Sequence, residues 1–164
     1  MTRMTDPFDA LQSFQQALVD GEIDLQRGQI DPELFVHLDH PNGQPRFTYV
    51  RLQRQTVTAM VNFAISDPIE GVRCFQIGVA VPEAYRSQRR AKCTVGAAIT
   101  ELQHGLARNK VSTFYVEAVV GIDNEASKHV AAATISTTPV EVTDQVSGLP
   151  ALHYVRKIGE VAAG

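Results

Sequence analysis

The chain has 164 residues, a length that fits one folded domain, since single domains usually hold roughly 100–200 residues. Its formal net charge is −3, and 44% of its residues are hydrophobic. This composition supports a buried core. It excludes a disordered acidic chain and argues against binding to nucleic acid through bulk positive charge.

The cysteine content and the length of the apolar runs exclude further classes of protein. The two cysteines, Cys74 and Cys93, are too few for a disulfide framework, and no Cys/His cluster has zinc spacing, so we expect no metal site. The longest apolar runs, such as 77–82, are too short to cross a bilayer, and the first residues lack the apolar core of a secretory signal. We therefore expect a soluble, cytoplasmic protein that forms a single domain over residues 1–164, with no membrane partner.

The first half of the chain predicts a helix followed by strands. Asp6 is a suitable N-cap, Pro7 suits the first helical position, and Gly21 follows an apolar stripe with helical spacing. Alternating and β-branched patterns then predict an antiparallel meander of strands, with turns at 41–43 and 67–71. These strands are expected at 34–38, 46–54, 56–65 and 72–81.

The hydrophobic period then changes to that of a helix. Apolar residues recur on one face from 91 to 108, and Arg108 and Asn109 suit a helix C-terminus. Strands are expected at 111–120, 140–143 and 152–158, a short helix at 123–133, and a turn at 147–150. Together these elements predict a mixed α/β fold.

The loop before the long helix carries a cluster of basic residues. The preceding strand ends at Pro82, and Arg86, Arg89, Arg90 and Lys92 surround the start of the helix. The first backbone amides of a helix lack internal partners and, together with the helix dipole, form a site suited to phosphate. One alternative is a solvated surface loop, and a second is a nucleic-acid site with steeply salt-dependent binding.

A second signal follows the next strand. Residues 120–127 leave that strand and enter a helix, with Asp123 as a good N-cap. Asn124 projects an amide at the end of the strand, where it can exchange hydrogen bonds with an amide-rich ligand. The alternative is a well-capped helix with no further role.

In this order and separation, the two segments resemble the GNAT family of N-acetyltransferases. That family has a [Gln/Arg]-x-x-Gly-x-[Gly/Ala] loop, which Arg86 and Ala91 match at the outer positions, and an Asp-Asn-x-x-Ala/Ser-like sequence, which 120–127 matches. The likeness covers 46–158, whereas 1–44 is divergent. It implies the acyl-CoA N-acyltransferase fold, a mixed and largely antiparallel central sheet flanked by helices.

The resemblance implies that acetyl-coenzyme A is bound as a co-substrate. In such proteins the loop amides cradle the pyrophosphate, and a strand edge pairs with the pantetheine. Two central strands separate around it, usually at a bulge, which Gly78 would ease here. The cofactor-binding residues implied in this way are Val79, Ala80, Val81, Arg86, Ser87, Gln88, Arg89, Arg90, Ala91 and Asn124.

The implied reaction is direct attack of a primary amine on the thioester, which needs attack geometry, an oxyanion donor and a deprotonated amine. A backbone amide near 79–81 would serve the oxyanion. Glu117 is the candidate catalytic base, because its strand parity matches Val119 and places it toward the acceptor side of the cleft; the alternative is a surface cross-strand partner. Tyr49 and Tyr154 are candidates for the acceptor pocket or for the core.

The chain departs from the family pattern at two positions that matter. Arg89 replaces the middle loop glycine, which allows close backbone approach to phosphate, so Arg89 must adopt a tolerable backbone angle or the loop lies differently. The helix tyrosine that often protonates the leaving thiolate would fall near Ala131, where the chain has none. Two interpretations follow: an N-acetyltransferase for an unknown small-molecule or peptide amine, and a coenzyme A-binding module with little or no catalysis. A nucleic-acid partner is not expected, and a homodimer is compatible with the resemblance.

Overall fold

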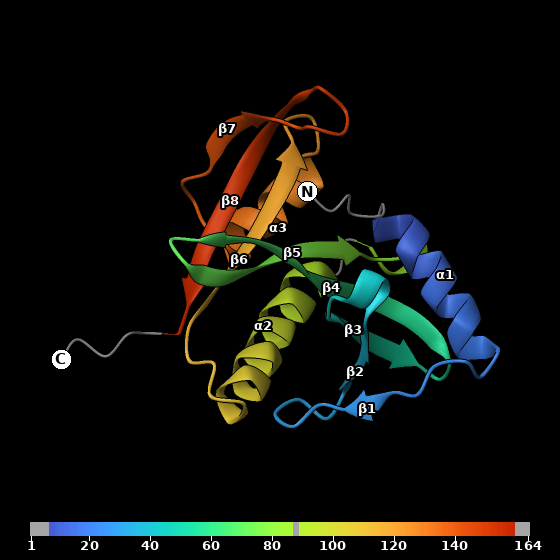
Figure 1. Cartoon of the computed structure of the whole chain (residues 1–164). Coiled ribbons are helices and arrows are strands. Elements are labelled where there is room, and N and C mark those ends of the chain that lie inside the picture. Colours follow the sequence, from blue (N-terminus) through green and yellow to red (C-terminus); the bar gives the residue numbers. More distant parts are fainter. Residues whose placement is uncertain (1–6, 87–88, 160–164) are drawn as a thin grey trace.

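The computed structural model describes residues 7–86 and 89–159. In this part of the chain eight strands form one sheet, in the spatial order β1-β2-β3-β4-β5-β6-β8-β7 (Figure 1). The strands are β1 (Gln26–Arg27), β2 (Leu34–Asp39), β3 (Arg46–Gln53), β4 (Thr56–Ile69), β5 (Val72–Ala80), β6 (Phe114–Gly121), β7 (Val140–Thr143) and β8 (Pro150–Ile158). The helices are α1 (Pro7–Val19), α2 (Arg90–Arg108) and α3 (Glu125–Thr134), with 3-10 turns η1 (Pro41–Gly43) and η2 (Glu83–Tyr85).

The sheet is mixed and largely antiparallel, which confirms the predicted fold class. Each pair of neighbouring strands is antiparallel except β5 and β6, which are parallel. A parallel pair needs a crossover connection, and α2 supplies it. None of the helices in the described ranges is long and apolar enough to span a bilayer.

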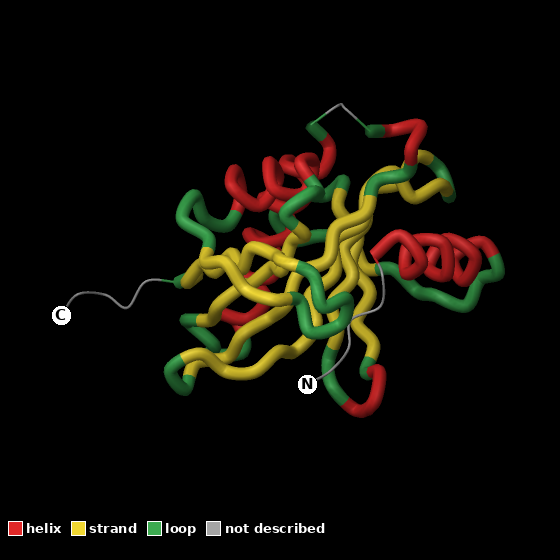
Figure 2. Tube along the Cα trace, turned by 90° about the horizontal axis from the view of Figure 1, so that it is seen from above, coloured by secondary structure: helices red, strands yellow, loops and turns green. Residues whose placement is uncertain are grey.

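Helices cover the two faces of the sheet unequally. The larger core packs α2 and α3 against one face, where Val61, Phe63 and Phe75 are fully or almost fully buried. The smaller core packs α1 against the opposite face, where Met60 lies beside Leu11. Because side chains alternate along a strand, β4 is buried on both faces and sits at the centre of the fold. Figure 2 shows the sheet between α1 on one side and the other helices on the other.

Most predicted elements are present, but three boundaries were wrong. β4 continues to Ile69 through the turn predicted at 67–71, because an irregularity between Ser66 and Ile69 takes Pro68, which lacks an N–H, out of the ladder. β6 begins only at Phe114, because the amide of Val111 still bonds to the end of α2. Pro150, placed in a turn by the sequence, begins β8 and pairs with Thr143. The predicted N-cap, Asp6, lies outside the described residues.

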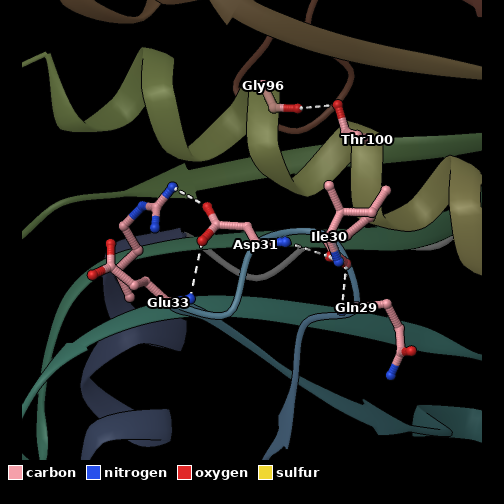
Figure 3. Close-up of polar contacts among 8 residues, drawn as sticks. Gln29, Ile30, Asp31, Glu33, Gly96 and Thr100 are labelled. Atoms are coloured by element: carbon pink, nitrogen blue, oxygen red, sulfur yellow. Dashed lines mark hydrogen bonds and ion pairs between the residues drawn. The ribbon is translucent and has the colours of Figure 1, made fainter.

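A buried carboxylate ties the segment after β1 to α2. Glu101, on α2, is 6% exposed and accepts backbone hydrogen bonds from the N–H groups of Gln29, Ile30 and Asp31. The dashed lines in Figure 3 mark contacts at Gln29, Ile30 and Asp31, on the loop that passes beside the helix. A Cβ on Gly28 would lie 2.4 Å from the Asp31 carbonyl oxygen, so only glycine fits there.

An ion pair extends this attachment to the sheet. The guanidinium of Arg51 on β3 lies 2.8 Å from the carboxylate of Asp31, and this hydrogen bond holds the pKa of Asp31 below its usual value. The divergent first segment is therefore anchored both to α2 and to β3.

We expect Glu101→Ala to destabilise the protein by about 2–4 kcal/mol, because it leaves three partly buried backbone donors without an acceptor. The free energy of unfolding from urea titration measures this effect. Gln103→Ala, at an exposed position on the same helix, is the control and should stay within about 0.5 kcal/mol of the wild type. Equal effects of the two substitutions would contradict the assignment.

Candidate functional site

The parallel strands β5 and β6 are paired only at their beginning. The ladder joins Cys74 to Tyr115, Phe75 to Val116 and Gln76 to Glu117. Beyond the last pair, both strands continue without pairing to each other, and Figure 1 shows the orange and red strands turned away from the green ones. A cleft of about 1160 Å³ lies between them, with 77–81 on one wall and 118–121 on the other.

The separation lies between two parts of the sheet that are each fully paired. β5 stays in regular register with β4 through Gly78, which pairs with Asn62, so the bulge expected there is absent from this ladder. β6 likewise stays paired with β8 along its whole length. The strand separation implied by the resemblance is therefore present, but it arises where two intact ladders diverge and not from a local defect at Gly78.

The cleft passes through the sheet and reaches both of its faces. On the α2–α3 face it is lined by apolar side chains such as Val95 and Val130. On the α1 face it is lined by Phe8, Gly78 and Val119. A long ligand entering from one face can therefore present its end to the other.

One end of the cleft is the N-terminus of α2. Arg89, Arg90, Ala91 and Lys92 line the cleft there, together with Arg86 from the preceding loop. The first amides of a 19-residue helix supply unpaired donors and the positive end of its dipole. Residues predicted for the phosphate site thus lie together at one end of the cleft; Ser87 and Gln88, predicted with them, lie outside the described residues.

The backbone of Arg89 is left-handed. Its φ of +58° and ψ of +15° lie in the left-handed region, which a glycine adopts without strain, and it is the N-cap of α2. The loop therefore keeps a conformation typical of glycine while placing a guanidinium at the mouth of the cleft.

Aromatic rings and backbone position two of the neighbouring cations. Arg86 donates from Nε to the carbonyl oxygen of Val81 at 2.9 Å, and its guanidinium lies 5.5 Å from the Phe8 ring centroid. The Arg90 guanidinium lies 5.1 Å from the ring of Tyr85. Within the described ranges, no carboxylate forms an ion pair with Arg86, Arg89 or Lys92, so these charges are available to an anion.

The cap of α3 differs from the prediction. The N-cap is Asn124 and not Asp123: the Asn124 side-chain oxygen accepts from the amide of Ser127 at 3.1 Å. Asn124 also lines the cleft. The cap engages only its oxygen, and the side-chain N–H groups remain the donors that it can offer to a ligand.

Neither Tyr49 nor Tyr154 is among the described residues that line the cleft. Ala131, the position expected to carry a tyrosine in related proteins, lines the cleft as a small apolar side chain. Tyr49 and Tyr154 are 5% and 3% exposed and belong to the core beneath α2, and burial raises the pKa of Tyr49. The core alternative is therefore correct for both tyrosines.

Glu117 lies at the point where the two strands part, in a polar cluster. Its Oε1 accepts a hydrogen bond from Ser66 at 2.6 Å, and its Oε2 lies 3.0 Å from Nε2 of His153. The hydrogen bond with His153, supported by Ser66, holds the pKa of Glu117 below its usual value despite burial. Burial and the nearby Glu117 charge raise the pKa of the Cys74 thiol to about 12, so this thiol is neutral.

Sequence reasoning missed Ser66 and His153. They lie 51 and 36 residues from Glu117 along the chain, and the pairing of β8 with β6 and of β5 with β4 brings them together. The signal available in the sequence was strand parity, which was applied to Glu117 alone.

We expect Glu117→Gln to destabilise the protein at pH 7 by about 1.5–3 kcal/mol, because two hydrogen bonds to a charged group are weakened. A carboxylate whose pKa is lowered by folding contributes stability above its unfolded value of 4.5, and this is lost as pH falls through the folded value. The gap between wild type and variant should therefore narrow below pH 4.5 in urea titrations at a series of pH values.

The control for this titration is Glu141→Gln, on exposed strand β7, which should follow the wild-type curve throughout. A gap between wild type and Glu117→Gln that stays constant down to pH 3 would contradict the lowered pKa.

Comparison with known proteins places the fold. No protein-family model matches the sequence, and no curated protein matches it. A solved GNAT-family acetyltransferase from Streptococcus pneumoniae has a TM-score of 0.53 at 17% identity, covering 96% of this chain and 98% of that one. An acetyl transferase from Salmonella typhimurium, described as modifying the N-terminal serine of a 50S ribosomal subunit protein, has a TM-score of 0.53 at 18% identity, covering 96% and 94%.

A third structure is the ribosomal alpha-N-protein acetyltransferase RimL in complex with coenzyme A. Its TM-score is 0.50 at 19% identity, covering 69% of this chain and 62% of that one, so this chain spans less than two thirds of its length. At these identities the likeness is one of fold. The protein has the fold of GNAT acetyltransferases, as the sequence motifs indicated.

Proposed function

We propose that this protein binds acetyl-coenzyme A in the cleft between β5 and β6 and transfers the acetyl group to a primary amine. The observation that carries the proposal is the open separation of these strands, which ends at the N-terminus of a long helix surrounded by cations. A volume of about 1160 Å³ exceeds that of most small-molecule pockets, roughly 300–1,000 Å³, and suits a long ligand.

The basic end of the cleft fits the diphosphate of coenzyme A. Backbone amides at the start of α2 provide donors in the direction of the dipole, and Arg89 and Lys92 add charge. Arg86 and Arg90, held against aromatic rings, supply further cations at the same mouth. The left-handed conformation of Arg89 leaves the loop backbone in a form that approaches phosphate closely.

The walls of the cleft fit the pantetheine arm. The edge of β5 that faces the cleft, at 79–81, is not paired to β6 and offers backbone donors and acceptors. Asn124 offers an amide from the opposite wall. Val95, Val130 and Ala131 supply the apolar surface along the remaining wall.

When bound, acetyl-coenzyme A supplies a thioester as the acetyl donor. The chain's own part is to hold that thioester along the unpaired edge of β5, to donate a backbone N–H near 79–81 to the developing oxyanion, and to bring the amine to attack distance. The polar cluster around Glu117 lies at the closed end of the cleft, where β5 and β6 part. Its members are not among the described residues that line the cleft, but they form a hydrogen-bonded group of titratable side chains at that end, and we assign to this group the proton of the amine.

The acceptor is a small-molecule or peptide amine. Two structures of the same fold are described as acting on ribosomal proteins, which favours a peptide α-amine as the first acceptor to test. A coenzyme A-binding module without catalysis is the second candidate. It is favoured because Ala131 lies where related proteins often have the tyrosine that protonates the leaving thiolate.

We expect wild-type protein to bind coenzyme A and Arg89→Glu to bind it about 10- to 100-fold more weakly, because the substitution reverses a charge at the phosphate end. Arg89→Gly should retain more affinity than Arg89→Glu, since glycine accepts the left-handed angle. Isothermal titration calorimetry with coenzyme A measures both.

Arg73→Glu is the matched control, because Arg73 is exposed on β5 and is absent from the described lining of the cleft. It should bind coenzyme A as the wild type does. Absence of binding by the wild type would refute the proposal, and binding without thiol release across a broad panel of amines would favour the module.

A further inference from the structure

We propose that His153 is the group that takes the proton from the acceptor amine, and that Glu117 is the positioning residue that fixes its ring. This inference rests on the proposed function, which it deepens by assigning a side chain to the proton transfer. His153 belongs to β8, in the closing part of the chain, and nothing in its local sequence singled it out.

A hydrogen bond joins the side chains of His153 and Glu117. His153 Nε2 lies 3.0 Å from Oε2 of Glu117. An ionised carboxylate is only an acceptor, so Nε2 carries the hydrogen and the neutral ring keeps Nδ1 as its acceptor. A histidine oriented in this way by a carboxylate is the arrangement that general bases use, because the carboxylate stabilises the imidazolium that forms.

Glu117 is poorly suited to act as the base itself. Its side chain is 14% exposed, and both oxygens are engaged, one by Ser66 and one by His153. The same contacts hold the pKa of Glu117 below its usual value, which makes its carboxylate a weak base near neutral pH. The His153 side chain is 30% exposed, so an amine can reach it where it cannot easily reach Glu117.

His153 lies one strand away from the cleft. In the β6–β8 ladder His153 lies directly opposite Val119, and Val119 lines the cleft on the α1 face. Directly opposite residues of an antiparallel pair share one face, so His153 lies on the same face as Val119, one strand away from the cleft and not among its described lining residues. An acceptor that approaches the cleft along this face can reach it. Val140 of β7 lies on its other side, and Val119 and Val140 are 40% and 64% exposed.

Few charged groups surround His153. Among the described residues, Glu117 from β6 bonds to it, Cys74 from β5 lies beyond Glu117 as a neutral thiol, and the charge of Asp67 from β4 acts on Cys74. On β8 itself, Lys157 shares the parity of His153 but lies over the ring of Tyr115, with 5.8 Å from its nitrogen to the ring centroid.

The proton balance of the step is as follows. The ammonium gives one proton to Nδ1 of His153, and the imidazolium passes it to solvent. The amine nitrogen then forms a bond to the acetyl carbon as the carbon–sulfur bond breaks. The second nitrogen proton ends on the leaving sulfur, so the products are an amide, a thiol and one proton in solution.

Nuclear magnetic resonance tests the orientation of the ring without any acceptor. In protein labelled with ¹⁵N-histidine, we expect neutral His153 as the Nε2–H form in the wild type and as a mixture of both neutral forms in Glu117→Gln, where the acceptor is no longer a carboxylate. His153→Gln assigns the signal by its loss, and exposed His104 on α2 is the internal control, whose signals should be alike in both proteins. Mixed His153 forms in the wild type, or a His153 tautomer unchanged by Glu117→Gln, would overturn the proposal.

Kinetics test the proton transfer. His153→Gln keeps a donor near the Nε2 position but removes the base, so coenzyme A affinity by calorimetry should be unchanged. Thiol release from acetyl-coenzyme A should fall about 100- to 10,000-fold with tripeptides bearing a free α-amine, N-acetyl-lysine or spermidine as probes. The pH at which kcat/KM rises should also shift toward the pH at which the free amine itself loses its proton. His104→Gln should remain within about twofold of the wild type.

The outcomes separate the two proposals. If the wild type binds no coenzyme A, the proposed function fails. If it binds coenzyme A and releases thiol, but His153→Gln does so equally with the same pH profile, only the role of His153 is overturned. If it binds coenzyme A and releases no thiol with any of these probes, the proton-transfer role is overturned while the binding site stands.

Discussion

The structure depends on a parting between two β-ladders that are each complete. β5 keeps its partner β4, and β6 keeps its partner β8, so each strand satisfies its backbone groups on one edge. After three parallel pairs the other edges separate. Because buried backbone groups need partners, a ladder that ends early leaves donors and acceptors for a ligand to meet. The cleft, its polar edge and its position above α2 all follow from this divergence.

The helix α2, which connects β5 to β6, contributes both to the cleft and to the attachment of the loop after β1. Its N-terminus faces the cleft and carries the cations, while Glu101, three turns further on, holds the amides of the loop after β1. A parallel strand pair requires such a crossover, and its length places the dipole at the mouth of the cleft and the clamp at the far edge of the sheet. Binding site and N-terminal segment are thereby attached to one rigid element.

The closed end of the cleft combines residues of different character. Ser66, Cys74, Glu117 and His153 come from four adjacent strands and form one hydrogen-bonded group at the apex of the split. A charged carboxylate beside a neutral thiol and an imidazole is sustained by the hydrogen bonds it receives. The open side of this group is flanked by exposed valines, which gives an acceptor apolar surface next to a polar one.

The sequence by itself determined the elements, the mixed sheet and the basic loop at the start of α2. Periodicity and turn residues are local signals, and Arg89 and Asn124 lie in short segments between a strand and a helix, where the structure makes each of them an N-cap. What only the tertiary structure decided was which strands diverge and which side chains meet there. β4 continued to Ile69 and left the predicted turn to Glu70 and Gly71, and His153 joined Glu117 across β6 and β8, because strand register depends on packing between residues far apart in sequence.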